Sequence, residues 1–191
     1  MDYKSTTLFT RDERILDFKR LATEKIDLKG ATTPINESLV LALNNIGFFT
    51  APASVSYHGN KEGGLYDHSR AVADKLIDMT HELKLKWERQ ISPFIVGMFH
   101  DLCKCDQYIR DAEHSGYTYN DSLLLKEHGA KSIMILSQFM TLTEEEVMCI
   151  RYHMGAYQKD EWDELGRAIE KYPNVLWTHT ADMVAARIMN K

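Results

Sequence analysis

FIVGMFHDLCK, the stretch Phe94–Lys104, decides the fold. Its apolar residues, with Ile91 just before it, recur at steps of three and four, which predicts a helix. So much of the segment is apolar that the helix should be central and buried. His100 and Asp101 stand near its end. Because an unpartnered buried carboxylate is costly, we expect a cation or a metal ion beside Asp101.

Length and composition predict one globular domain, 1–191. The chain has 191 residues, of which 44% are hydrophobic and 27% charged, which is enough for a substantial core. No apolar run approaches the ~20 residues of a membrane span, and the first residues lack the order of a signal peptide, so we expect a cytoplasmic protein. The formal charge of −5 comes without a Lys/Arg-rich block, so nothing indicates a nucleic-acid-binding protein.

Three cysteines, Cys103, Cys105 and Cys149, contain no C-x-x-C pair. An odd number without such a pair argues against a disulfide framework and against a zinc site made of thiolates. We therefore expect all three to be reduced.

The N-terminal part of the chain has two helical patterns. Thr10 and Glu13 have the spacing of a capping box, which predicts a helix at 11–24. A second pattern ends at Gly47, a residue typical of helix C-termini. We expect these N-terminal helices, 10–47, to pack on the core that the rest of the chain forms.

Two later segments are predicted to interrupt an otherwise all-α chain. The first is aromatic and polar together, with Ser115 and Gly116 as a turn between two tyrosine-bearing arms, which predicts a short β-hairpin flap around 106–120. The second, GAYQKDEWDELG at 155–166, is interpreted as a loop. The predicted fold is therefore an all-α bundle with one small hairpin.

Titratable side chains recur on the inner faces of five predicted helices. His68 and Asp182 lie within apolar stripes, and His153 lies on the inner side of a helix that a Thr143–Glu146 capping box begins. All-α packing can bring such groups to one point. Their imidazoles and carboxylates suit iron, manganese, cobalt, nickel or zinc, and the carboxylates also accept magnesium. The candidate metal ligands are His68, His100, Asp101, His128, His153 and Asp182.

The order of these groups resembles a known family, the HD superfamily of metal-dependent phosphohydrolases. Its signature is an ordered H, HD, D set on a helical core, here His68, the His100–Asp101 doublet and Asp182. The segments GGLYDHS, FHDLCK and THTADMVAA resemble the family patterns GG-L-x-x-H-S/T, L-H-D-[IL]-G-K and H-x-A-D-x-[LVM]-x-A. The resemblance covers about 58–187 and implies a single HD-domain helical bundle.

The resemblance leaves the number of metal ions open. Members with two divalent ions carry extra histidine ligands like His128 and His153, and their doublet aspartate, here Asp101, bridges the ions. In the alternative, His128 and His153 bind phosphate or water. A single ion then has four protein ligands, which are His68, His100, Asp101 and Asp182.

Three further residues are interpreted through the resemblance. Lys104 would contact a substrate phosphate or orient Asp101, with a surface ion pair to Asp106 as the alternative. His58 would face the substrate, although a capped loop histidine fits equally well. Cys103 replaces the glycine that is usual in the family, and we interpret it as a small buried apolar side chain, because the metal site needs no sulfur.

The function that the resemblance implies is metal-dependent hydrolysis of a phosphomonoester or phosphodiester bond. The expected substrate is a nucleotide or another small phosphoester, with Asp101 and Lys104 as catalytic groups. Three alternatives stay open: a di-iron HD oxygenase, an HD hydrolase that resembles RNA exonucleases, and a catalytically silent HD domain that binds a nucleotide. The loops that would choose among substrates have conformations that the sequence does not determine.

Overall fold

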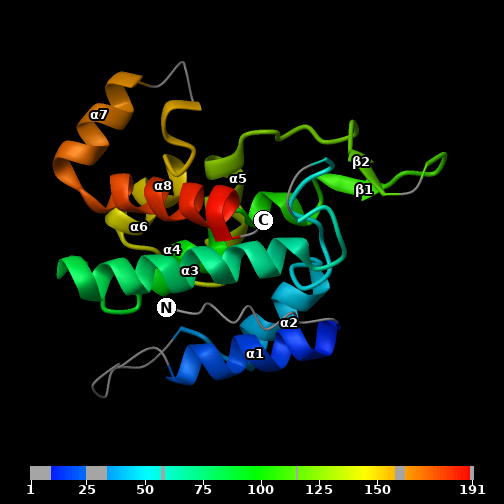
Figure 1. The fold of residues 1–191 in the computed structure, drawn as a ribbon, viewed down its shortest axis with the longest axis horizontal. Coiled ribbons are helices and arrows are strands. Elements are labelled where there is room, and N and C mark those ends of the chain that lie inside the picture. Colours follow the sequence, from blue (N-terminus) through cyan, green and yellow to red (C-terminus); the bar gives the residue numbers. More distant parts are fainter. Residues whose placement is uncertain (1–9, 25–33, 57–58, 115, 158–161, 190–191) are drawn as a thin grey trace.

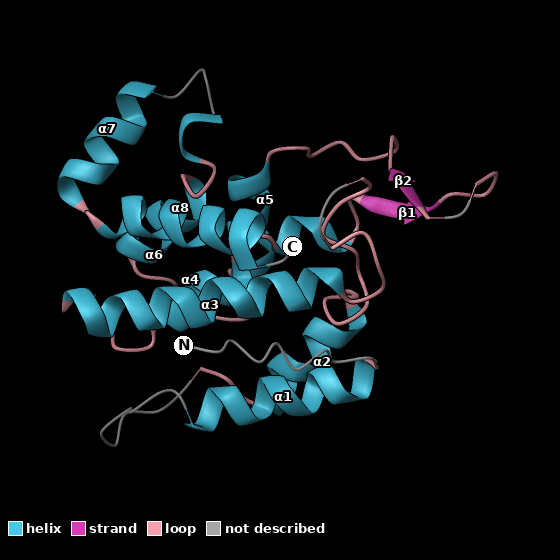
Figure 2. Ribbon diagram, viewed as in Figure 1, coloured by secondary structure: helices cyan, strands magenta, loops and turns pink. Residues whose placement is uncertain are grey.

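The computed structural model describes residues 10–24, 34–56, 59–114, 116–157 and 162–189. Eight α-helices and one two-stranded antiparallel sheet make up most of the regular structure in these ranges, which confirms the predicted all-α fold with a small hairpin (Figures 1 and 2). The helices are α1 (Arg11–Glu24), α2 (Glu37–Asn45), α3 (Gly64–Leu83), α4 (Ser92–Phe99), α5 (His128–Leu136), α6 (Glu144–Arg151), α7 (Trp162–Lys171) and α8 (Asn174–Val184). None of these described helices is long and apolar enough to cross a membrane.

Helix α3 runs through the middle of the molecule (Figure 1). Helices α4 and α8 pack against it, and α6 packs on both α4 and α8. In the same view α1 and α2 lie on the side of α3 opposite α8. This arrangement surrounds the C-terminal end of α4 with helices, so that groups from several of them can meet there.

An aromatic cluster joins the N-terminal helices to this core. The ring of Phe18 on α1 lies 6.0 Å from Phe94 and 6.1 Å from Phe99 of α4, measured between centroids. Phe48, just after α2, lies 5.8 Å from the ring of Tyr66 on α3. All five rings are buried. Burial of each such side chain contributes about 1.5–3 kcal/mol, so this cluster anchors α1 and α2 firmly.

The predicted continuous helix through Phe94–Lys104 is wrong at its C-terminal end. Helix α4 stops at Phe99, and Leu102–Cys105 forms a turn of 3₁₀-helix. The N–H of Cys103 donates to the hydroxyl of Ser132 on α5 (3.0 Å) instead of continuing the α-helical ladder. His100 and Asp101 therefore lie where the chain turns, and α5 holds that turn in place.

The predicted loop at 155–166 is also wrong in part, because α7 begins at Trp162. Its first turn carries two acidic residues, which suits the positive end of a helix dipole, and Leu165 and Ala168 are buried on one face. Gly166, within this helix, resembles a helix breaker in the sequence. Packing of the apolar face outweighs its weak helix propensity.

The hairpin pairs β1 (Tyr108–Arg110) with β2 (Tyr117–Tyr119), with Tyr108 opposite Tyr119 and Arg110 opposite Tyr117. The predicted flap around 106–120 is therefore confirmed. Figure 2 shows the two strands in magenta at one end of the helical body. The guanidinium of Arg110 stacks 4.6 Å from the centroid of the Tyr117 ring, which stabilises the register of the pair.

Gly97 lets α4 approach α3 closely, and Gly97→Ala is expected to destabilise the fold. A Cβ at this position would lie 2.7 Å from the backbone nitrogen of Ala73 on α3. Alanine improves helix propensity by about 1 kcal/mol, but forcing the helices apart costs roughly 1–3 kcal/mol or more, since backbone atoms cannot rotate away. Thermal unfolding should show a lower Tm.

Gly166→Ala is the matched control for this substitution. It is also a glycine within a helix, but among the described residues nothing beyond its chain neighbours and the backbone of its own helix lies within 4 Å of the added Cβ. It should raise the Tm, because only the gain in helix propensity remains. Equal effects at the two glycines would contradict the close packing of α3 on α4.

Candidate metal centre

Five of the six predicted ligands meet at the C-terminal end of α4. His68 comes from α3, His100 and Asp101 follow α4, His153 follows α6, and Asp182 comes from α8. The rings of His68 and His153 lie 5.4 Å and 4.9 Å from that of His100, between centroids. All except Asp182 are buried, and the Asp182 side chain is only 16% exposed. The structure therefore gathers groups that are up to 114 residues apart (182 − 68).

Asp101 lies at the centre of this cluster. Its Oδ2 is 3.4 Å from His100 Nε2 and 3.7 Å from His68 Nε2. Its Oδ1 is 3.5 Å from His153 Nε2, on the other side of the carboxylate. Asp182 completes the group, since its Oδ1 lies 3.1 Å from His68 Nε2.

Hydrogen bonds of the Nδ1 atoms of two histidines fix the direction of their rings. His100 Nδ1 lies 2.9 Å from the carbonyl of Gly97, and His153 Nδ1 lies 2.8 Å from the carbonyl of Ile150. An Nδ1–H that donates to a backbone carbonyl leaves Nε2 as the lone-pair nitrogen, which is the usual arrangement of a metal-binding histidine. In both rings Nε2 then faces the carboxylates.

Three atoms within the cluster need a partner. Among the described residues, His100 Nε2, His153 Nε2 and Asp101 Oδ1 are buried and have no hydrogen-bond partner. Leaving such a group unsatisfied costs about 1–3 kcal/mol, more if it is charged. All three are ligand atoms, so a metal ion fits the donor set that they form, and the buried histidines and aspartates of this cluster could hold one.

The charges of the cluster favour a cation. Burial alone would raise the pKa of Asp101, but the ammonium of Lys104 and the ring of His100 outweigh it and hold that pKa well below its usual range. Burial is likewise outweighed at Asp182, where the hydrogen bond and charge of His68 lower the pKa. At His100, burial would lower the pKa, but the carboxylates of Asp101 and Asp182 raise it. The carboxylates stay ionised and favour a positive charge beside them, which a protonated histidine or a metal ion can provide.

His128, the sixth predicted ligand, lies on the other side of Asp101. It is the first residue of α5, and its Nδ1 lies 3.3 Å from the sulfur of Cys103. Ligand atoms of Asp101, Cys103 and His128 all lie within 4.8 Å of one another, so these residues could also hold a metal ion. Burial lowers the pKa of His128. Its ring is therefore neutral at pH 7, the form that binds metals.

Lys104 contacts Asp101 directly, with its Nζ 2.7 Å from Oδ2. The alternative pairing with Asp106 is wrong, because Asp106 is occupied by Lys131 at 2.6 Å. His58 lies outside the described residues. Lys104 therefore places its ammonium group beside the carboxylate of Asp101.

Cys103 is the residue whose interpretation changes most. The prediction that its side chain is buried is confirmed, since only 2% of the residue is exposed. Its sulfur also has a polar neighbour, His128 Nδ1, at 3.3 Å. Burial and the charge of Asp101 raise the pKa of the thiol to about 12, so it is protonated in the metal-free protein. In the sequence, the position of Cys103 two residues after Asp101 could have indicated that its sulfur lies near the candidate ligands.

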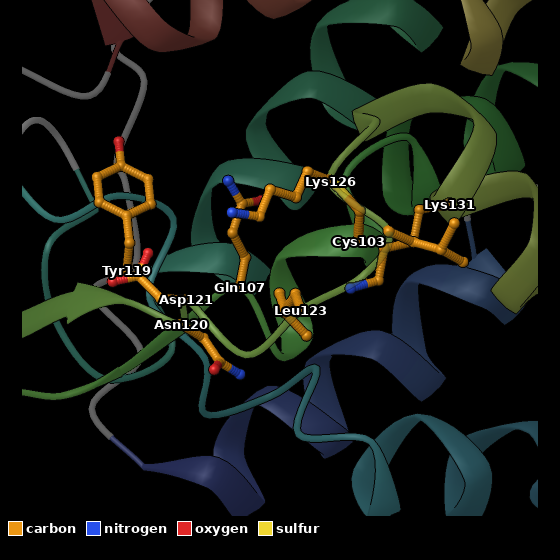
Figure 3. Close-up of a pocket in the computed structure, with 9 residues that line it drawn as sticks. Cys103, Gln107, Tyr119, Asn120, Asp121, Leu123, Lys126 and Lys131 are labelled. Carbon is orange, nitrogen blue, oxygen red and sulfur yellow. The ribbon is translucent and has the colours of Figure 1, made fainter.

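A cavity of about 330 Å³ adjoins this side of the cluster (Figure 3). Cys103 and Lys131 line it from the helical body, Gln107 and Tyr119 from the hairpin, and Leu123 from the segment that follows. Apolar, aromatic and polar side chains thus surround one space. Because Cys103 lines the cavity and also contacts His128, the cavity borders the candidate metal ligands.

Comparisons with known proteins do not add a name to this geometry. No family model, curated protein or solved structure matches the chain.

Proposed function

We propose that this protein is a metal-dependent phosphohydrolase of the HD type, acting on a nucleotide or another small phosphoester. The observation that carries the proposal is the buried cluster around Asp101, in which His100 Nε2, His153 Nε2 and Asp101 Oδ1 have no hydrogen-bond partner among the described residues. The H, HD, D order of the sequence supports the same reaction. Iron, manganese, cobalt, nickel and zinc all suit this donor set.

The ligands in this proposal are His68, His100, Asp101 and Asp182, with His128 and His153 as further ligands. A divalent ion bound there supplies Lewis acidity and lowers the pKa of a water molecule toward neutrality. Asp101 stays ionised, as metal binding requires, because Lys104 and His100 lower its pKa. His128 is assigned to metal binding, since burial lowers the pKa of its ring and so favours the neutral form that binds metals.

Lys104 has a separate role in the proposed reaction. Its pKa is raised, because the attraction of Asp101 outweighs burial, so the ammonium remains protonated. Its side chain is 17% exposed, which leaves part of it accessible from solvent. A substrate phosphate at the cluster would gain an ammonium that neutralises the charge that develops on its oxygens.

The cavity beside Cys103 is the proposed place for the organic part of the substrate. A volume of about 330 Å³ is at the lower end of the range of small-molecule sites. The amide of Gln107 offers a hydrogen-bond donor and an acceptor, and Tyr119 offers an aromatic face. This mixture suits a nucleobase, which stacks with its face and forms hydrogen bonds with its edge.

The direct test is hydrolysis by protein that has been purified without chelator and then loaded with Mn²⁺, Fe²⁺, Co²⁺, Ni²⁺ or Mg²⁺ under reducing conditions. Substrates should include an aryl phosphate, an aryl phosphodiester and a panel of nucleotides. We expect turnover that a chelator removes and added metal restores. Absence of turnover with every metal and substrate would contradict the proposal, and oxygen consumption with anaerobically loaded iron would favour the oxygenase.

Lys104→Met is expected to lower kcat by roughly 10²–10³-fold, as loss of a group that stabilises transition-state charge does. Metal content should remain, because the ammonium is not a ligand. Lys104→Arg keeps the charge and should recover part of kcat. The measurement is steady-state kinetics together with metal analysis of the same samples. An unchanged kcat in Lys104→Met would show that Lys104 only balances the charge of Asp101.

A further inference from the structure

We infer that the thiolate of Cys103 is a metal ligand, and that it holds a second ion together with His128 and Asp101. The inference rests on the proposed function, because it requires that the cluster around Asp101 binds metal. It adds a sulfur ligand to a site for which the sequence indicates only nitrogen and oxygen. Cys103 is thereby assigned a chemical role in place of a packing role.

The three ligand atoms already lie close together. Cys103 Sγ is 3.3 Å from His128 Nδ1, and ligand atoms of Asp101, Cys103 and His128 all fall within 4.8 Å of one another. Donor atoms bound to one ion lie about 3–4 Å apart, since each is roughly 2.0–2.3 Å from it. Little movement would be needed for the three to share an ion.

The fold fixes this proximity. The N–H of Cys103 donates to the hydroxyl of Ser132 at 3.0 Å, and Ser132 stands on α5, the helix that begins with His128. The turn that bears the thiol is therefore tied to the helix that bears the imidazole. Asp101, two residues before Cys103, contributes one of its carboxylate oxygens.

The other two cysteines lack these features. Cys149 is buried in the hydrophobic core. Cys105 is only partly buried and packs at the edge of that core. Among the described residues, neither belongs to a group of side chains that could hold a metal ion. They are therefore matched controls for Cys103 within the same chain.

A thiolate ligand would also select the metal. Sulfur favours zinc, cobalt or ferrous iron and disfavours magnesium, which prefers oxygen. The thiol would lose its proton to solvent as the ion binds. Because Cys103 also lines the cavity of about 330 Å³, this ion would lie on the side of the cluster that faces the proposed substrate.

The test is Co²⁺ loading of the full chain, read by absorption and by metal analysis. A Co²⁺–thiolate bond gives an intense charge-transfer band in the near ultraviolet, which nitrogen and oxygen ligands do not give. The band should be present in wild type and should persist in the double variant Cys105→Ser/Cys149→Ala, in which Cys103 is the one remaining thiol. Cys103→Ser should lose the band and bind one ion fewer per chain.

The outcomes separate this inference from the proposed function. If wild type binds no metal, the proposed function fails and this inference fails with it. If wild type binds metal but shows no charge-transfer band, Cys103 contributes at most a hydrogen bond to His128, and this inference alone is overturned. A band that persists in Cys103→Ser would overturn it equally. If Cys103→Ser does not fold, the double variant still decides the matter, because Cys103 is its one remaining thiol.

Discussion

Asp101→Asn is expected to remove bound metal and, with it, phosphoester hydrolysis. The carboxylate of Asp101 lies within 3.7 Å of His68, His100 and His153 nitrogens, so it contacts more of the cluster than any other described ligand. Loss of a residue that merely supports a ligand weakens metal binding by about 10–100-fold, and loss of a central ligand should cost more. Asparagine keeps the shape of the side chain but not its charge.

The effect should be visible without any assay of activity. A metal ion at 100 times its Kd stabilises the folded protein by about 2.7 kcal/mol, which raises the Tm of a chain of this size by roughly 5–11 °C. Wild type should show this rise when metal is added, and Asp101→Asn should not. Differential scanning fluorimetry with and without metal, combined with metal analysis, measures both. Undiminished metal content in the variant would contradict the ligand assignment.

Asp17→Asn is the matched control for this experiment. Asp17 is also a buried aspartate, but it accepts a hydrogen bond from Tyr66 (2.8 Å) and pairs with Arg70 (2.6 Å) in the interface between α1 and α3. Its loss should lower the Tm through a broken buried ion pair. The rise in Tm on addition of metal should remain, because none of its partners is a candidate ligand.

Local signals in the sequence account for much of the fold. Two T-x-x-E patterns predict helix starts, and both capping boxes form: Glu13 N–H donates to Thr10, and Glu146 N–H donates to Thr143, each at 3.2 Å. The helix predicted at 11–24 is α1. Such caps depend only on residues three positions apart, which is why the sequence alone identifies them.

The candidate metal centre could also be predicted in part from local patterns. Helical stripes indicate that His68 and Asp182 face inward, and the HD doublet identifies His100 and Asp101. The stripes do not determine distances between helices, so the position of His153 beside Asp101 follows only from the way α6 packs on α4.

Contacts between distant segments explain what the sequence could not predict. Asp106 pairs with Lys131, 25 residues away, and so is not the partner of Lys104. Cys103 meets His128 only because α5 packs on the turn after α4. In both cases the residues nearby in the sequence suggest one contact partner, and tertiary packing provides a different one.

Glu146→Ala is expected to be the most destabilising substitution away from the metal cluster. The Glu146 side chain is fully buried and accepts hydrogen bonds from the hydroxyl of Ser92 (2.7 Å), the Nε of Arg89 (3.1 Å) and the N–H of Thr143 (2.9 Å). It also pairs with Nη2 of Arg89. One carboxylate thus caps α6 and ties it to the start of α4.

Alanine would remove all of these bonds at once. Hydrogen bonds to a charged group contribute about 1.5–3 kcal/mol each, so loss of the two from Ser92 and Thr143 alone should cost about 3–6 kcal/mol, which lowers the Tm by roughly 6–24 °C in a chain of this size. The hydroxyl of Ser92 would be left buried without its acceptor. Glu146→Gln keeps one acceptor oxygen and should lie between alanine and wild type. Thermal unfolding with metal-free protein measures the effect without a contribution from metal binding.

Glu144→Ala provides the matched control within the same helical turn. Glu144 is exposed and pairs with Lys171 at the surface (2.6 Å), where such pairs contribute little. Its removal should leave the Tm nearly unchanged. At temperatures at which it is folded, Glu146→Ala should still bind metal. His100 and His153 follow the last turns of α4 and α6, whereas Glu146 joins the first turns of these two helices. Equal Tm values for the two alanine variants would show that the hydrogen bonds and the ion pair of Glu146 do not stabilise the fold.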